Sequence, residues 1–161
     1  MVGIGIRVYS NSKVFYALIE KMPDDSLLYR DIAHLNVPLA LDKPERLNFV
    51  RNTILDIMIE YNVETAVIRL SEQQQSATAK TIERYFLEGV IQESLASCAV
   101  NKFCAGQIGR LSGLLQWHRT DFKQYAAADK TLADFSWSIG WSELEKEERE
   151  SVLACLAALN L

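Results

Sequence analysis

The sequence has few of the residues that hold structural metal ions. Its three cysteines, Cys98, Cys104 and Cys155, include no CxxC pair, and its two histidines, His34 and His118, lie far apart. A structural zinc site needs four ligands at characteristic spacings, and a disulfide framework uses a denser, even set of cysteines. We therefore predict no metal site built on these residues, and reduced thiols of the kind found in cytoplasmic proteins.

Long apolar runs and an excess of positive charge are also missing. No apolar run is long enough to cross a bilayer, and no leader pattern opens the chain, so we expect a cytoplasmic protein with no membrane partner. The net charge is −4, which argues against a global field that attracts nucleic acid. Nucleic acid as a partner would need a local basic stripe, for which the candidates are Lys80, Arg84, Lys102, Arg110, Arg119, Lys123 and Lys130. The alternative is an ordinary solvated surface.

The chain is long enough, and hydrophobic enough, to form one hydrophobic core. The 161 residues are 49% hydrophobic, which predicts a single domain over 1–161. Two β-prone runs, 2–9 and 14–20, flank the polar turn SNSK, a pattern typical of a hairpin. A third alternating run, 27–35, follows after a short turn. Three strands joined by short turns predict an antiparallel meander.

Helices and strands then alternate. Asp42 and Glu45 form a capping box that opens a helix ending near Asn62. The mostly apolar run 64–70 predicts a strand buried on both faces, and Ser71 with Gln74 offers a cap for a long helix over 75–95. Ile82, Tyr85, Phe86 and Val90 are expected on the inner face of that helix.

The C-terminal third predicts a fifth strand at 97–103, a helix within 107–117 and partly helical structure over 118–134. Ser142 and Glu145 form another capping box, which predicts the start of the last helix. Together these elements predict an α/β fold with a mixed five-stranded sheet, three antiparallel strands followed by two parallel ones, flanked by helices.

Four stretches resemble a known family. They are VGIGIRVYS at the start, PERLNFVRNTILDIMIEYNVETAVIRL, SATAKTIERYFLEGVI, and ERESVLACLAAL near the end. Together they resemble the RuvC-like Holliday-junction resolvases of the ribonuclease H-like superfamily. The resemblance implies a ribonuclease H-like fold in which about four carboxylates, on strand ends and the last helix, hold paired metal ions for phosphodiester hydrolysis.

The acidic positions of that family are mostly replaced here. Matched one position at a time, the first acid falls on Arg7 and the second on Arg69, the third near Glu148 and the fourth on Ser151. Arginines in the first two positions would repel Mg²⁺ rather than bind it. Helical spacing predicts that Glu148 shares a face with Val152 and the residues beyond it, and so faces the arginines. We therefore predict a degenerate site formed by Arg7, Arg69, Glu148 and Ser151, with no catalytic or metal-binding residue.

Three functional interpretations stay open. The favoured one is a non-catalytic ribonuclease H-like domain that acts as a binding or assembly subunit, with a nucleic-acid-processing system as its setting. A second is an active Mg²⁺-dependent nuclease whose rearranged acidic site uses Glu148, Glu150, Asp31 or Glu72. A third is an anion or nucleotide sensor, because paired arginines suit bidentate recognition of phosphate. For Arg7 and Arg69 themselves, the favoured interpretation is a structural ion-pair cluster with Glu148 at the strand ends rather than an anion site.

A final stretch, 135–141, alternates large apolar residues with small polar ones. Its apolar members are Phe135, Trp137, Ile139 and Trp141. One interpretation is that they pack beneath the last helix as part of the core. The other is an interface for a protein partner or for a homodimer, because tryptophan and phenylalanine are common interface anchors.

Overall fold

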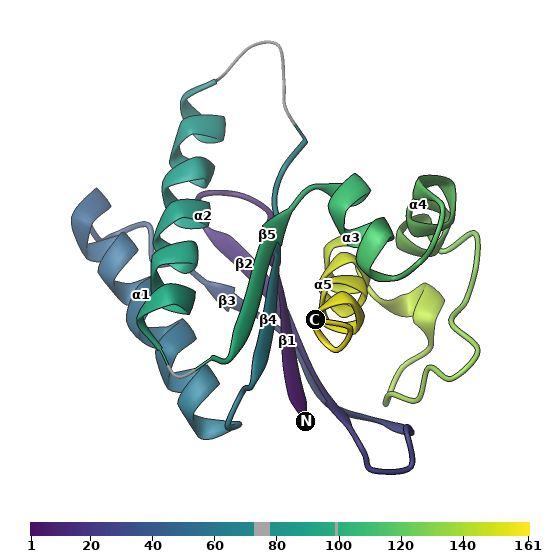
Figure 1. The fold of residues 1–161 in the computed structure, drawn as a ribbon. Coiled ribbons are helices and arrows are strands. Elements are labelled where there is room, and N and C mark those ends of the chain that lie inside the picture. Colours follow the sequence, from purple (N-terminus) through teal and green to yellow (C-terminus); the bar gives the residue numbers. More distant parts are fainter. Residues whose placement is uncertain (73–77, 99) are drawn as a thin grey trace.

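In the computed structural model, residues 1–72, 78–98 and 100–161 are described, and they form a five-stranded mixed sheet with helices on both faces (Figure 1). The strands are β1 (Val2–Val8), β2 (Lys13–Lys21), β3 (Leu27–Asn36), β4 (Thr65–Arg69) and β5 (Lys102–Gly106). The helices are α1 (Lys43–Glu60), α2 (Ala79–Ser97), α3 (Ile108–Leu114), α4 (Arg119–Ala127) and α5 (Lys146–Ala158), with a short 3₁₀ turn at Trp141–Glu143. The predicted α/β class and mixed sheet are confirmed.

The sheet has the order β3-β2-β1-β4-β5, so β1 is its centre. β1 pairs antiparallel with β2 and parallel with β4, and β4 pairs parallel with β5. Helices α1 and α2 cover one face, and α5 covers the other together with α3 and α4 (Figure 1). Side chains alternate along β1, so Ile4 and Ile6 point toward α1 and α2, whereas Gly5 and Arg7 point toward α5.

Helix α5 lies directly against the middle of β1. A Cβ atom at Gly5 would lie 2.1 Å from both the carbonyl oxygen of Ser151 and the amide nitrogen of Cys155. Only glycine permits backbones to approach this closely. The Cys155 thiol donates to the Gly3 carbonyl at 3.1 Å, and burial raises the pKa of that thiol. The three cysteines form no disulfide in this structure; Cys155 is buried, whereas Cys98 and Cys104 are partly buried.

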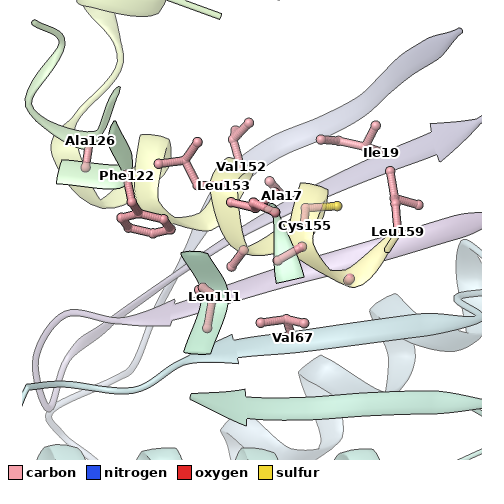
Figure 2. Close-up of a cluster of buried hydrophobic side chains, with 14 of the residues drawn as sticks. Ala17, Ile19, Val67, Leu111, Phe122, Ala126, Val152, Leu153, Cys155 and Leu159 are labelled. Atoms are coloured by element: carbon pink, nitrogen blue, oxygen red, sulfur yellow. The ribbon is translucent and has the colours of Figure 1, made fainter. Parts of the chain in front are cut away.

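A hydrophobic cluster is built around α5 (Figure 2). Val152 and Leu153 on this helix are fully buried, Leu111 of α3 lies beside the end of β5, and Phe122 of α4 belongs to the same cluster. A second cluster lies between the opposite sheet face and helices α1 and α2. A domain with two such clusters places its central strand in a dry environment on both sides.

The predicted start of α1 is confirmed in detail. The amide of Glu45 donates to Asp42 Oδ1 at 2.9 Å, and the amide of Asp42 donates to Glu45 Oε2 at 3.0 Å. The predicted helices within 107–117 and 118–134 are also present, as α3 and α4. Among the described residues, no helix combines the length and the apolar character that a membrane crossing requires.

Three predictions of detail were wrong. The fifth strand begins at Lys102, because 97 still belongs to α2. The last helix begins at Lys146 with Glu145 as its N-cap, since 141–143 instead form the 3₁₀ turn. The inner face of α2 consists of Leu87, Ile91 and Leu95 rather than the stripe that contains Ile82, Tyr85 and Phe86. Gln74 of the predicted cap and 75–77 of the predicted helix lie outside the described residues.

Candidate functional site

Two neighbouring strands bring a pair of arginines together at their carboxyl ends. Arg7 of β1 and Arg69 of β4 are direct register partners. Both side chains lie on the sheet face that α5 covers, and their exposed fractions are only 11% and 3%. Arg7 Nη1 also donates to the main-chain carbonyl of Arg69 at 3.4 Å. The predicted proximity of these two residues is confirmed.

A carboxylate from α5 lies between the two arginines. Glu150 Oε2 is 2.6 Å from Arg7 Nε, and Glu150 Oε1 is 3.8 Å from Arg69 Nη2. The Arg7–Glu150 contact is an ion pair whose N–H is not aligned as a hydrogen bond. Glu150 is 4% exposed, so its charge is balanced by guanidinium groups rather than by water.

Two further carboxylates and a third arginine complete the group. Glu88 of α2 accepts hydrogen bonds from the amide and hydroxyl of Ser71 at 3.0 and 2.7 Å. Its Oε1 also lies 4.0 Å from Arg7 Nη1 and 3.9 Å from Arg84 Nε. Glu72 lies 3.3 Å from Arg69 Nη2. We call this set the arginine–glutamate cluster: Arg7, Arg69, Arg84, Glu72, Glu88 and Glu150.

The cluster contains as many guanidinium groups as carboxylates. Burial lowers the pKa of Arg69, and the charge of Arg7 acts in the same direction, whereas Glu150 opposes the shift. Arginine nevertheless stays protonated in proteins, so the charges persist and hold one another. Within the described residues, the Nε atoms of Arg69 and Arg84 are buried without a hydrogen-bond partner. Charge therefore holds this cluster together more than aligned hydrogen bonds do.

Two of the four residues predicted for this site lie elsewhere on α5. Glu148 does not face the arginines: its Oε2 accepts from the amide of Glu145 at 2.7 Å and closes the first turn of the helix. Ser151 packs against β1 at Gly5, and its hydroxyl donates to the carbonyl of Glu148 at 2.7 Å. Glu150 fills the position expected for Glu148.

Sequence reasoning missed Glu88 altogether. This residue is 4% exposed, and it lies among Leu87, Ile91 and Leu95 on the buried face of α2. If the stripe of Leu87, Ile91 and Leu95 is taken as the inner face of this helix, Glu88 is predicted to be a lone acid on that face. An acid in such a position needs a buried cation or several donors, which is a usable signal in the sequence.

The other acid proposed for a rearranged site does not join the cluster. Asp31 of β3 accepts a hydrogen bond from the Tyr16 hydroxyl at 2.9 Å. Tyr16 packs with the cluster beneath α1 and α2, so this pair lies on the sheet face opposite Glu150. Burial, with the neighbouring Asp31, raises the pKa of Tyr16.

Most of the aromatic stretch packs inside the molecule. Trp141 is 2% exposed and its indole donates to the Tyr125 carbonyl at 3.1 Å. Phe135 stacks edge-on against both Trp141 and Tyr29. Trp137 packs against the same hydrophobic cluster, and Ile139 is 41% exposed. The packing interpretation therefore accounts for three of the four side chains, and the interface stays a prediction.

The seven basic candidates do not line one surface. Lys102 begins β5 and lies at the opposite end of the sheet from the strand ends that approach Arg84. Lys130 pairs with Asp121 at 2.7 Å, and Arg84 belongs to the arginine–glutamate cluster. Three of the seven candidates are thus separated from one another or paired with acids, which favours the ordinary solvated surface over a stripe.

The whole fold matches solved structures of Holliday-junction resolvases. A structure of Thermus thermophilus RuvC in complex with Holliday junction substrate matches with a TM-score of 0.74 and 9% identity, covering 99% of this chain and 94% of that one. The chain has the RuvC fold. A second T. thermophilus RuvC structure matches with a TM-score of 0.72, 10% identity and the same coverage. The yeast mitochondrial Holliday junction resolvase Ydc2 matches with 0.57 and 12% identity, covering 98% and 77%.

No protein-family model and no curated protein matches the sequence. The structural likeness therefore confirms the predicted ribonuclease H-like fold, while the identities of 9–12% leave the chemistry to the residues of this chain. The resemblance of the sequence to RuvC-like resolvases implies paired metal ions, so the residues at the strand ends decide whether such ions fit.

The residues at these strand ends are not suited to binding a pair of metal ions. Divalent metals such as Mg²⁺ require several oxygen ligands, usually including carboxylates free of competing cations. Here Arg7 and Arg69 occupy the ends of β1 and β4, and Glu150 already contacts both of them. Across the described ranges, His, Cys, Asp and Glu side chains form no group of three or more that could hold a metal ion.

Proposed function

We propose that this chain is a non-catalytic RuvC-fold subunit that acts by binding or assembly rather than by cutting phosphodiester bonds. One observation carries the proposal: the guanidinium groups of Arg7 and Arg69 share the Glu150 carboxylate between the central strands and the last helix. A catalytic metal pair would need unpaired carboxylates in the same small space.

Charge balance supports this interpretation. The arginine–glutamate cluster holds three positive and three negative groups, so it needs no metal ion to neutralise it. A divalent ion placed there would meet two guanidinium groups in a low-dielectric environment, where like-charge repulsion is strongest. The same balance weakens the anion-sensor alternative, because Glu150 and Glu88 already occupy the arginines that a phosphate would bind.

The rearranged-nuclease alternative lacks a common location for its acids. Glu148 closes the first turn of α5, and Asp31 lies on the other face of the sheet with Tyr16. Glu72 and Glu150 do lie near each other, but both contact Arg69. A two-metal site needs its carboxylates to converge on ions about 4 Å apart, which this arrangement does not provide.

The partner class to test first is branched DNA. The T. thermophilus RuvC structure contains a Holliday junction substrate, and this chain covers 94% of that protein's fold. Binding without cutting would let the chain hold a junction or compete with an active enzyme. Because the net charge is −4, we expect weak binding with few phosphate contacts, and therefore only a modest decline of affinity with salt.

Cleavage assays test the proposal directly. Purified chain is incubated with branched, single-stranded and duplex DNA in Mg²⁺ or Mn²⁺, and we expect no product above the no-protein control. The variant Glu150→Gln provides the critical comparison, with Glu148→Gln as a matched control on the same helix. Cleavage that disappears in Glu150→Gln and persists in Glu148→Gln would overturn the proposal. Cleavage that both variants retain would also overturn the proposal, provided that a mock preparation from the same host gives no product.

Gel-shift measurements address binding separately. The chain is titrated against a four-way junction and against duplex of the same length, at low and physiological salt. Tighter binding to the junction at both salt concentrations would support a nucleic-acid role. Equal, salt-sensitive binding to both would restrict the proposed role to protein assembly.

A further inference from the structure

A groove opens at the end of the sheet where β1 begins and β2 finishes. Its walls come from the turn between β2 and β3, the segment that follows α3, and the end of α5. Its volume is about 830 Å³, within the range of about 300–1,000 Å³ that is typical of ligand sites. Figure 1 shows the turn between β2 and β3 projecting at the same end of the sheet as the N label. The arginine–glutamate cluster lies at the opposite end of β1, so an occupant of this groove does not meet it.

The less exposed part of the groove lining is mostly apolar. Leu115 and Leu159 are buried there, whereas Leu156 and Trp117 are only partly buried. The Trp117 ring packs on the ring of Tyr125 with 4.7 Å between the centroids. Lysine and arginine side chains bury their aliphatic stems along apolar surface of this kind, and a tryptophan ring attracts their charged ends.

The more exposed part of the lining carries an excess of negative charge. Asp24, Asp25 and Asp134 lie there, and within the described residues only Asp25 has a basic partner, Lys21 at 2.9 Å. Asp24 accepts hydrogen bonds from the amide and hydroxyl of Ser26 at 3.1 and 2.6 Å, which hold the pKa of Asp24 below its usual value. Three carboxylates against one ammonium group leave the groove with a net charge of −2.

The end of α5 adds to this negative potential. The helix finishes at Ala158, and the carbonyl groups of its last turn form the negative end of the helix dipole. A basic residue often balances this end, but the last turn of α5 has none. Lys130 lies over the Tyr125 ring, and its ammonium group is already paired with Asp121 at 2.7 Å. The groove therefore favours an occupant that brings its own positive charge.

We propose that this groove docks an extended basic segment of a partner protein. Arginine or lysine side chains of that segment lay their stems along Leu156 and Trp117 and place their charged ends beside Asp24 and Asp134. The same negative charge disfavours nucleic acid and anionic lipid as occupants. The inference rests on the assembly role proposed above, and it gives that role a class of partner.

The test uses the full chain with octa-arginine as the probe and octa-glutamate as the charge control. Calorimetry should give a dissociation constant of about 10–100 μM for octa-arginine at low salt, rising as salt is added, and no binding of octa-glutamate. Octa-arginine should also change the tryptophan fluorescence. Trp117→Phe keeps a ring against Tyr125 and should abolish that change. A fluorescence change that persists in Trp117→Phe would place the peptide elsewhere and overturn the proposal.

A matched pair of double variants separates the groove from the overall charge. Asp24→Asn with Asp134→Asn changes the groove, whereas Asp56→Asn with Glu60→Gln makes the same change of charge at exposed positions of α1. We expect the groove pair to raise the dissociation constant at least about tenfold and the α1 pair less than about twofold. Equal weakening by the two pairs would show only bulk attraction and overturn the proposal.

Leu156→Lys tests the same groove from the opposite direction. The new side chain places a cation of this chain in the groove, at the end of α5 where positive charge is favourable. We expect octa-arginine binding to be lost, and the Tm shows whether the variant is folded. A folded Leu156→Lys that binds like the wild type would contradict the proposal. If Leu156→Lys does not fold, the pair of double variants still decides, because those substitutions are all at exposed positions.

Two further outcomes would refute the inference. One is a wild-type chain that does not bind octa-arginine at about 500 μM. The other is spermine binding as tightly as octa-arginine, which would make the groove a polyamine site rather than a protein-docking site. The variants lie outside the arginine–glutamate cluster, so DNA cleavage sensitive to Glu150→Gln would refute the non-catalytic function and leave peptide binding unchanged. Loss of the peptide interaction alone would refute only the groove.

Discussion

Two adjacent residues of α5 illustrate two ways of burying charge. Glu150 lies against Arg7 and Arg69, so positive and negative side chains neutralise each other. Arg149, which is 7% exposed, has no carboxylate within ion-pair distance among the described residues. Burial lowers its pKa, while Glu147 and Glu148 oppose the shift at longer range.

Arg149 instead binds the main chain. Its Nε donates to the Ala126 carbonyl at 2.8 Å, and its Nη1 donates to the carbonyls of Trp141 at 3.3 Å and of Leu144. The guanidinium thus connects the end of α4 and the 3₁₀ turn to the last helix. The two sites differ in the kind of partner. The partners of Glu150 are side chains, which substitution can remove, whereas the partners of Arg149 are main-chain carbonyls, which remain in every variant.

The largest loss of folding stability should follow from removing the carboxylate of Glu150, which Arg7 and Arg69 share. Glu150→Ala leaves Arg7 and Arg69 buried without their common partner, and breaking a buried pair on one side costs about 3–5 kcal/mol. Urea unfolding followed by circular dichroism measures this cost. Glu148→Ala is the matched control and should cost far less, because Glu148 bonds only to a helix-end amide. Equal costs would show that the cluster is not a coupled unit.

Removing Arg149 should come next. Arg149→Leu keeps the apolar part of the side chain and leaves buried carbonyls without a donor, which we expect to cost about 2–3 kcal/mol. Hydrogen exchange should rise first around 126–128 and 141–144, where those carbonyls lie. Arg110→Leu, on an exposed position of α3, is the control. A uniform loss of hydrogen-exchange protection across the sheet would show that Arg149 does not act locally on the end of α4 and the 3₁₀ turn.

A double substitution distinguishes the two sites most sharply. Arg7→Met combined with Glu150→Leu removes one positive and one negative group, and leaves Arg69 with Glu72 and Arg84 with Glu88. Replacing a buried ion pair by apolar residues is often close to neutral, so we expect a net cost of about 0–2 kcal/mol. The double-mutant cycle should show strong coupling. Additive costs would argue that the two residues do not act as a pair.

The smallest expected effect is the dependence of the Glu150→Ala stability cost on salt concentration. The penalty of Glu150→Ala should change by less than about 0.5 kcal/mol between low and high ionic strength, because buried charges are poorly screened. The exposed pair Lys130–Asp121 gives the contrast, since any effect of Asp121→Ala should vanish at high salt. Urea unfolding at both salt concentrations measures each. A salt-sensitive Glu150 penalty would place the cluster in contact with solvent.

Most of the fold could be predicted because its signals are local. The hairpin, the buried strand β4 and the capping box of Asp42 and Glu45 each depend on residues close in sequence. The errors came where periodicity is ambiguous. Helix α2 has two apolar stripes, each at helical spacing, so periodicity alone does not decide which one meets the sheet. Helix α5 is buried all around, so its periodicity could not choose between Glu148 and Glu150.

The sequence by itself determined the fold class and the order of elements, because alternation and capping are short-range properties, and its resemblance to a known family placed Arg7 and Arg69 on neighbouring strands. The tertiary structure alone decided which glutamate meets those arginines, which face of α2 stays exposed, and that Arg149 binds backbone rather than carboxylate. Each of these depends on how a helix is rotated against the sheet, and that rotation follows from packing contacts such as Gly5 with α5, between residues far apart in the chain.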